Sequence, residues 1–197
     1  MTQPRALRAD SERTVRAILE AAERVLSGNP AATMEQIAEA AHVARTTVHR
    51  RFATREALVE ALAAWAADQF AAAVAAARPD TAPPLVALYQ VTANVLRVKI
   101  GWRYALGRAA SASPEVARVH ADVLEGCDRL IRRAQSVGAL RADIDPVWCR
   151  RVYYALIFEV TQGHELDDTD IDALATRVVD TLLRGFGAAP HDAALRA

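Results

Sequence analysis

Arginine and histidine side chains gather in one stretch of the sequence, between Glu39 and Glu56, that contains no acidic residue. They are His42, Arg45, His49, Arg50, Arg51 and Arg55. Contacts to phosphate supply most of the affinity of proteins for nucleic acids, so a local excess of positive charge matters more than the total charge. The chain as a whole is neutral, with 24 basic and 24 acidic residues. The stretch predicts a nucleic-acid-binding surface; the alternative is a solvated basic face on an ordinary short helix.

This stretch can form a reading surface if residues 45–51 are helical. With Val43, Val48 and Phe52 anchored in a core, the three- and four-residue steps of a helix turn the polar side chains outward. Those side chains are Arg45, Thr46, His49 and Arg50. Arginine can bond a guanine edge in the major groove, and threonine can contact a phosphate or a thymine methyl group. Arg51 and Arg55 come next in the stretch and are placed to contact the flanking phosphate backbone of the nucleic acid.

No complete catalytic or metal-binding pattern is found in the sequence. Glu39 and His42 have the Glu-x-x-His spacing of di-iron helical bundles, but there is no second copy. The acidic run at residues 167–172 precedes an expected helix, where carboxylates cap free N–H groups, so it does not require a metal. Glycine-rich nucleotide motifs, GxSxG and HExxH are absent. We therefore expect no enzymatic activity, no cofactor and no metal.

Composition and periodicity predict an all-α protein of about nine helices. Alanine is abundant, whereas glycine and proline together account for 16 of 197 residues. Thr33 followed by Gln36 has the capping-box spacing, and residues 78–84 interrupt the helical pattern. Residues before 12 are expected to form a mobile basic arm. One expected helix is two turns long and begins after Thr33. The others cover residues 12–26, 45–51, 54–77, 84–98, 102–110, 114–137, 146–162 and 170–186.

Features of export or membrane insertion are also missing. The longest charge-free stretch, residues 81–96, is shorter than the roughly 20 residues that span a bilayer. The N-terminus has no apolar segment of the kind found in a secretory signal. Cys127 and Cys149 match neither a zinc site nor a disulfide framework. We expect a cytoplasmic protein without a membrane partner.

The two short helices and their basic flank resemble a known DNA-binding segment. Residues 37–62, IAEAAHVARTTVHRRFATREALVEAL, are similar to the helix-turn-helix of the TetR (tetracycline-repressor-like) family, and the similarity covers about residues 11–60. The resemblance implies that Thr33, Thr47 and Arg55 contact phosphates. It also implies that the bases are faced by Arg45, Thr46 and His49.

Three positions depart from the family's usual residues. His42 replaces the usual glycine in the turn, His49 replaces tyrosine in the recognition helix, and Ala53 replaces proline. A histidine at positive φ is allowed at some energetic cost. The resemblance implies three parts: a three-helix DNA-binding domain over residues 1–53, a helical effector-binding and dimerisation domain over 54–187, and a loose tail over 188–197.

The C-terminal helices offer candidates for a ligand site. Within residues 114–137, His120 and Cys127 fall on the apolar stripe, which indicates that both lie on the buried side. Aromatic residues on neighbouring helices could line a cavity with them. The full candidate set is Tyr89, Trp102, Tyr104, His120 and Cys127. The alternative is that these residues are ordinary core.

The last two helices, residues 146–162 and 170–186, carry apolar stripes strong enough to pair with a second copy of the chain. The first of them is apolar nearly all round, which indicates burial on two sides. The predicted dimer interface comprises Tyr153, Leu156, Ile157, Val160, Leu174, Val178 and Leu182.

Together these patterns predict a homodimeric, sequence-specific DNA-binding regulator. By the resemblance it is a repressor released from a palindromic operator in double-stranded DNA by an unknown small-molecule effector. The alternative is a helical small-molecule-binding or scaffold protein without specific DNA binding.

Overall fold

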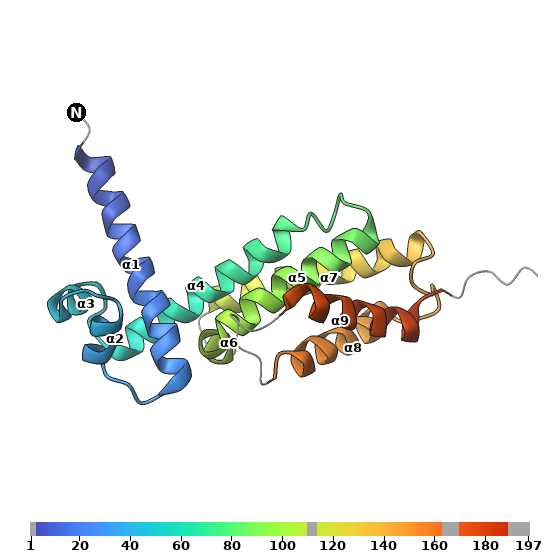
Figure 1. Ribbon diagram of the computed structural model, residues 1–197. Coiled ribbons are helices and arrows are strands. Elements are labelled where there is room, and N and C mark those ends of the chain that lie inside the picture. The colour runs from blue at the N-terminus through green and yellow to red at the C-terminus, as the bar shows by residue number, and fades with distance from the viewer. Residues whose placement is uncertain (1–2, 110–113, 163–169, 189–197) are drawn as a thin grey trace, which may run out of the picture. The chain divides into compact units, whose positions relative to one another are not determined.

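The computed structural model describes residues 3–109, 114–162 and 170–188, and these residues form nine helices and no strand (Figure 1). The helices are α1 (Gln3–Gly28), α2 (Met34–Ala40), α3 (Arg45–Arg51), α4 (Arg55–Ala76), α5 (Pro84–Gly101), α6 (Arg103–Ala109), α7 (Pro114–Ser136), α8 (Pro146–Val160) and α9 (Ile171–Phe186). The all-α prediction is confirmed.

The N-terminal boundary of α1 differs from the expectation. The helix begins at Gln3, so the mobile arm expected before residue 12 is wrong for residues 3–11. Arg, Ala and Leu in this segment are good helix formers, and proline is tolerated in the first turn, where its missing N–H is not needed. The expected tail lies outside the described residues except for Ala188.

The chain divides into two compact units. One comprises Met1–Ala67 with Trp102–Ala117, and the other comprises Asp68–Gly101 with Arg118–Ala197. The first unit thus extends beyond the boundary expected at residue 53. It does so because the N-terminal half of α4 contributes Leu58 and Leu62 to its core.

The core of the first unit is formed where α1, α2, α3 and α4 meet. Its completely buried side chains include Ile18, Leu26, Ile37, Val48, Leu58 and Leu62. The Trp65 and Trp102 rings lie 4.2 Å apart between centroids, which joins α4 to the segment before α6 within this unit. These contacts hold the short helices α2 and α3, which are too short to be stable alone.

Helix α4 is also long and apolar enough, by length and composition, to cross a membrane, contrary to the expectation from charge-free stretches. Its side chains at Leu58, Leu62 and Ala66 are completely buried in the first unit. Core helices of soluble proteins can have the same length and composition.

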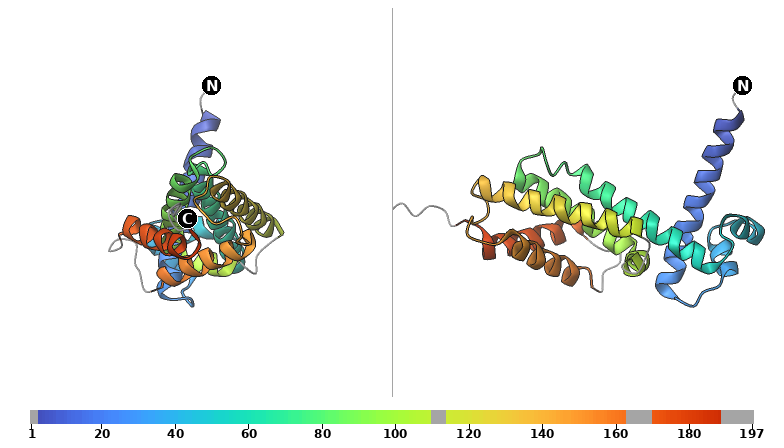
Figure 2. Two further views of the ribbon diagram at one scale, coloured as in Figure 1. Left: turned by 90° about the vertical axis from the view of Figure 1, so that its right-hand side faces the viewer. Right: turned by 180° about the vertical axis from the view of Figure 1, so that it is seen from behind.

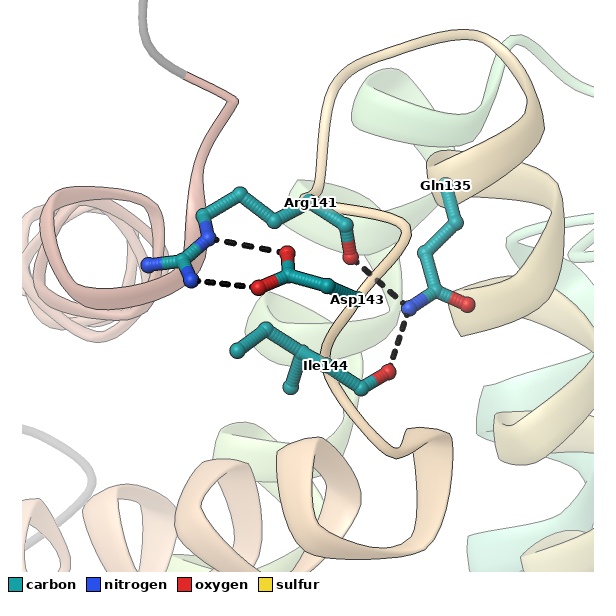
Figure 3. A network of polar contacts seen from close by, with 4 residues as sticks. All are labelled: Gln135, Arg141, Asp143 and Ile144. Carbon is teal, nitrogen blue, oxygen red and sulfur yellow. Dashed lines mark hydrogen bonds and ion pairs between the residues drawn. The ribbon is translucent and has the colours of Figure 1, made fainter.

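In the second unit α9 packs against α5 and α8 (Figure 1). Figure 2 shows the orange α8 and red α9 side by side from behind. The buried residues include Leu96, Tyr153, Val178 and Leu182. The connection from α7 to α8 is fixed by Gln135, whose Nε2 donates to the carbonyl oxygens of Arg141 at 2.9 Å and Ile144 at 2.7 Å. Arg141 also pairs with Asp143 at two atoms (Figure 3).

Candidate nucleic-acid interface

The predicted capping box begins α2. The Gln36 N–H donates to Thr33 Oγ1 at 3.3 Å, and the Thr33 N–H donates to Gln36 Oε1 at 2.8 Å. The Thr33 hydroxyl is exposed but already accepts a hydrogen bond within its own helix start.

A Schellman motif closes α2 and forms the turn into α3. The His42 N–H donates to Glu39 O and the Val43 N–H donates to Ala38 O, both at 3.0 Å. His42 occupies the left-handed position of this motif with φ 55°, where glycine is usual. The turn therefore keeps its geometry although a Cβ is present, at a cost in backbone energy.

Helix α3 is anchored by two side chains and exposes the others. Val48 is completely buried and Phe52 is buried at its C-terminal end. The predicted outward face is observed, because the residues exposed on this helix are Arg45, Thr46, His49, Arg50 and Arg51, with Thr47 half-buried. Among the described residues, none forms an ion pair with Arg50 or Arg51.

Arg45 is held over α2 in the free protein. Its Nη2 pairs with Glu35 Oε1 at 2.8 Å, and its Nε donates to His49 Nε2 at 3.5 Å. The pKa of Glu35 lies below its usual value. The largest causes are hydrogen bonds from the Glu35 backbone N–H and from Thr33, and the positive charges of Arg45 and His49 add to them. This pair is exposed, so water and salt screen it and Arg45 can leave it at little cost.

Arg55 connects the start of α4 to the loop between α1 and α2. Its Nη2 donates to Pro30 O at 2.5 Å and its Nε to Ala32 O at 3.5 Å. Thr54 caps α4 by accepting from the Ala57 N–H at 3.1 Å. Arg55 thus has a structural role that the spacing did not predict, and its guanidinium retains other donors on the half-exposed side chain.

Comparison with known proteins bears on this geometry. The profile of the bacterial regulatory proteins of the tetR family matches residues 18–62, which span the second half of α1 through the first turns of α4. The HTH-type transcriptional repressor LfrR of Mycolicibacterium smegmatis is 32% identical over 187 residues, which cover 93% of this chain and 97% of LfrR. The chain belongs to the TetR family. It is therefore a helix-turn-helix transcriptional regulator.

Solved structures of TetR-family proteins have the same fold. The crystal structure of LfrR from Mycobacterium smegmatis in complex with proflavine aligns with a TM-score of 0.67 and 30% identity, covering 90% of this chain and 99% of that one. PfmR of Thermus thermophilus aligns with a TM-score of 0.72 over 88% of this chain and 99% of that one. At 20% identity, PfmR supports the fold only.

One of the five ligand-site candidates in this TetR-family chain lines a cavity in the second unit. Cys127 faces it together with Tyr153 and Tyr154. Tyr89 instead donates from its hydroxyl to Asp180 Oδ1 at 2.5 Å, and this bond, with burial, raises the pKa of Tyr89.

The other three candidates lie elsewhere. Trp102 and Tyr104 pack against the core of the first unit. His120 is exposed, so its expected burial is wrong. It lies at the edge of the buried stripe that Val116 and Val123 define on α7, and its polar ring stays in solvent.

The predicted dimer interface needs correction. Five of its seven side chains are already buried within the single chain: Tyr153, Ile157, Leu174, Val178 and Leu182. Leu156 and Val160 are half-buried. The stripes face the chain's own core because α9 packs on α5. On α8 the large exposed apolar residues are instead Val147, Trp148 and Phe158, exposed by 39%, 53% and 61%.

Sequence reasoning missed Glu23, a buried carboxylate on α1. Its Oε1 accepts from the Tyr104 N–H at 2.7 Å and the Ser27 hydroxyl at 2.8 Å, and its Oε2 accepts from the Ala105 N–H at 2.9 Å. Glu23 thereby caps the start of α6 within the first unit. The signal was an acidic residue on the same helical face as Leu19 and Leu26, where only apolar residues were expected.

Proposed function

We propose that the protein is a repressor that reads double-stranded DNA by inserting α3 into the major groove. The observation that carries the proposal is the exposed face of α3 around completely buried Val48. A helix anchored on one side and polar on the other has the shape and chemistry that a major groove accepts. Base contacts are proposed for Arg45, Thr46, His49 and Arg50.

Phosphate contacts are proposed for residues around this face. Arg51 is exposed at the end of α3 and suits the flanking backbone. Thr33, Thr47 and Arg55 are assigned the same role by the family resemblance. For Thr33 and Arg55 this role adds to the bonds that each already makes, because a threonine oxygen has a second lone pair and a guanidinium has five donors.

The repressor is proposed to act as a homodimer on a palindromic site. The exposed Trp148 and Phe158 lie at three- and four-residue steps on α8 with Arg151 and Ala155, so they share one face. Burying large aromatic residues is a strong source of association energy. A two-fold dimer would place its recognition helices in successive major grooves, about 34–36 Å apart or a multiple of that.

A small-molecule effector is proposed to release the repressor from its operator in the bacterial cytoplasm. Support comes from the crystal structure of LfrR with proflavine and from the cavity in the second unit. Coupling between the two ligands must be reciprocal: an effector that weakens operator binding binds less tightly when operator is present, typically by about 1–3 kcal/mol.

Selection of bound fragments from a random DNA pool, followed by gel shift at two salt concentrations, tests the proposal. The selected sites should be palindromic, and their affinity should fall steeply with salt because bound phosphates release counterions. A selection that enriches no sequence, or a complex that is insensitive to salt, would instead favour a helical small-molecule-binding or scaffold protein.

A further inference from the structure

A narrow cavity inside the second unit adjoins an open groove on its surface. The cavity has a volume of about 30 Å³ and the groove about 450 Å³. Four residues line both spaces: Val74, Pro79, Val123 and Gly126. Because the same residues line both, the groove and the cavity meet at these four residues.

The chemistry of the cavity favours an uncharged occupant. Its described lining residues include no charged side chain; most are apolar, such as Phe70 and Leu130. The polar exceptions are Cys127, Tyr153 and Tyr154. Burial raises the pKa of Cys127 to about 12 and also raises the pKa of both tyrosines, so all three are neutral near pH 7.

The polar atoms of the cavity are largely satisfied by protein partners. The Thr92 hydroxyl donates to Leu88 O at 2.6 Å, so its 2.8 Å bond with Tyr153 is donated by the tyrosine. Among the described residues, no buried side-chain nitrogen or oxygen atom lacks a hydrogen-bond partner. A ligand group entering here therefore gains mainly from apolar burial.

The groove is wider and its lining is mostly apolar, with charged residues of both signs among it. Its charged lining residues are Arg78, Asp80, Asp122 and Arg129, two of each sign. Asp80 accepts from Arg129 Nε at 3.2 Å, and Arg133 donates to the carbonyl oxygens of Pro79 and Ala82, which fixes the groove wall. An uncharged body with hydrogen-bonding groups would find both donors and acceptors on this surface.

Gly126 lines both spaces and places no side chain between them. It lies in the middle of α7, where glycine disfavours a helix relative to alanine. Packing does not require it, because an added Cβ would meet only Arg129 Nη2 at 3.6 Å, an ordinary contact. The missing side chain instead leaves the boundary between groove and cavity without an obstructing side chain at this position.

We propose that groove and cavity form one binding site, which takes an uncharged small molecule whose body lies in the groove and whose short apolar end passes Gly126 into the cavity. The proposal rests on the proposed function, since it assigns the site and the chemical class of the effector. A cavity of this volume holds about two or three water-sized groups, so the apolar end is about two or three carbons long.

N-alkyl dansylamides test the proposal, because they are uncharged near neutral pH, fluoresce more strongly in apolar surroundings and can be made with chains from methyl to pentyl. For the parent chain, affinity should rise about fourfold per added methylene. The rise should stop near propyl. In Gly126→Leu this dependence on chain length should disappear, because the leucine side chain fills the passage.

Gly185→Leu is the matched control, since Gly185 is an exposed helical glycine with no neighbouring atom near its added Cβ; it should keep the chain-length dependence. If Gly126→Leu fails to fold, Gly126→Ala provides a smaller obstruction. In this variant the affinity should no longer rise for alkyl chains longer than ethyl. Equal chain-length dependence in parent and plugged variants, or no binding of any member to the parent, overturns the proposal. Operator binding by the parent without dansylamide tests the proposed function separately.

Discussion

His42 carries a backbone strain that a glycine would relieve. It holds φ 55° at the left-handed position of the α2 turn, with its side chain exposed. His42→Gly should raise the free energy of unfolding by about 1 kcal/mol, because the cost of the left-handed conformation disappears and is only partly offset by the entropy of glycine. Denaturant unfolding measures the change. His42→Ala keeps the strain and should not stabilise; equal stabilisation by both variants would contradict this explanation.

Both cysteine thiols should react slowly at neutral pH. Burial raises the pKa of Cys127 to about 12 and that of Cys149 to about 11. Since the thiolate is the reactive form, labelling by 5,5′-dithiobis(2-nitrobenzoic acid) at pH 8 should be at least about 200-fold slower than for free cysteine. The rate should increase about tenfold per pH unit up to about pH 10 while the fold is intact. Rapid labelling of the folded chain at pH 8 would show that these thiols are not protected, and unfolded chain provides the fast reference.

Glu23 acts at the scale of whole elements, because it joins α1 to the start of α6. Glu23→Ala would leave the Tyr104 and Ala105 N–H groups without their acceptor in a buried place, since Glu23 is only 3% exposed. We expect a loss of about 2–3 kcal/mol in the free energy of unfolding. Thermal or denaturant unfolding measures it. Glu12→Ala, on the exposed part of α1, should change little; similar losses in both would argue against the cap.

The elements themselves were largely predictable. Capping signals and three- and four-residue periodicity located α2, α3 and α4 because local interactions determine where these helices start and end. Periodicity indicates which face of a helix is buried but not what covers it. For this reason periodicity assigns the stripes of Tyr153 on α8 and Leu182 on α9 to a partner, although both side chains are buried in the chain's own core.

Single polar residues were less predictable. The exposed face of α3 followed from the apolar anchor Val48, but the pairing of Arg45 with Glu35 depends on how α2 and α3 are joined by the turn. Glu23 is buried only because α6 returns to α1 from about 80 residues further along the chain. Such long-range contacts leave almost no local signal.

At the scale of the whole molecule, the exposed α8 face predicts the assembly. Light scattering at micromolar concentration should give twice the mass of one chain. Phe158→Glu should reduce the measured mass to that of a single chain, because an unpaired carboxylate in an apolar interface costs about 2 kcal/mol or more. Val137→Glu, at an equally exposed valine near the end of α7, should leave the mass unchanged. A single-chain mass for the parent would contradict the dimer.

The most direct test of base recognition by α3 measures the binding affinity of Arg45→Ala for the selected operator and for every single-base variant of that operator. Arg45 is exposed and held only by a screened ion pair with Glu35 and a long hydrogen bond to His49, so it is free to reach a base edge. The variant should lose about 1–3 kcal/mol of binding free energy and its preference at one base pair in each half-site, while other preferences remain. Arg51→Ala, as a phosphate contact, should weaken all sequences about equally. An unchanged base-preference profile for Arg45→Ala would contradict the account.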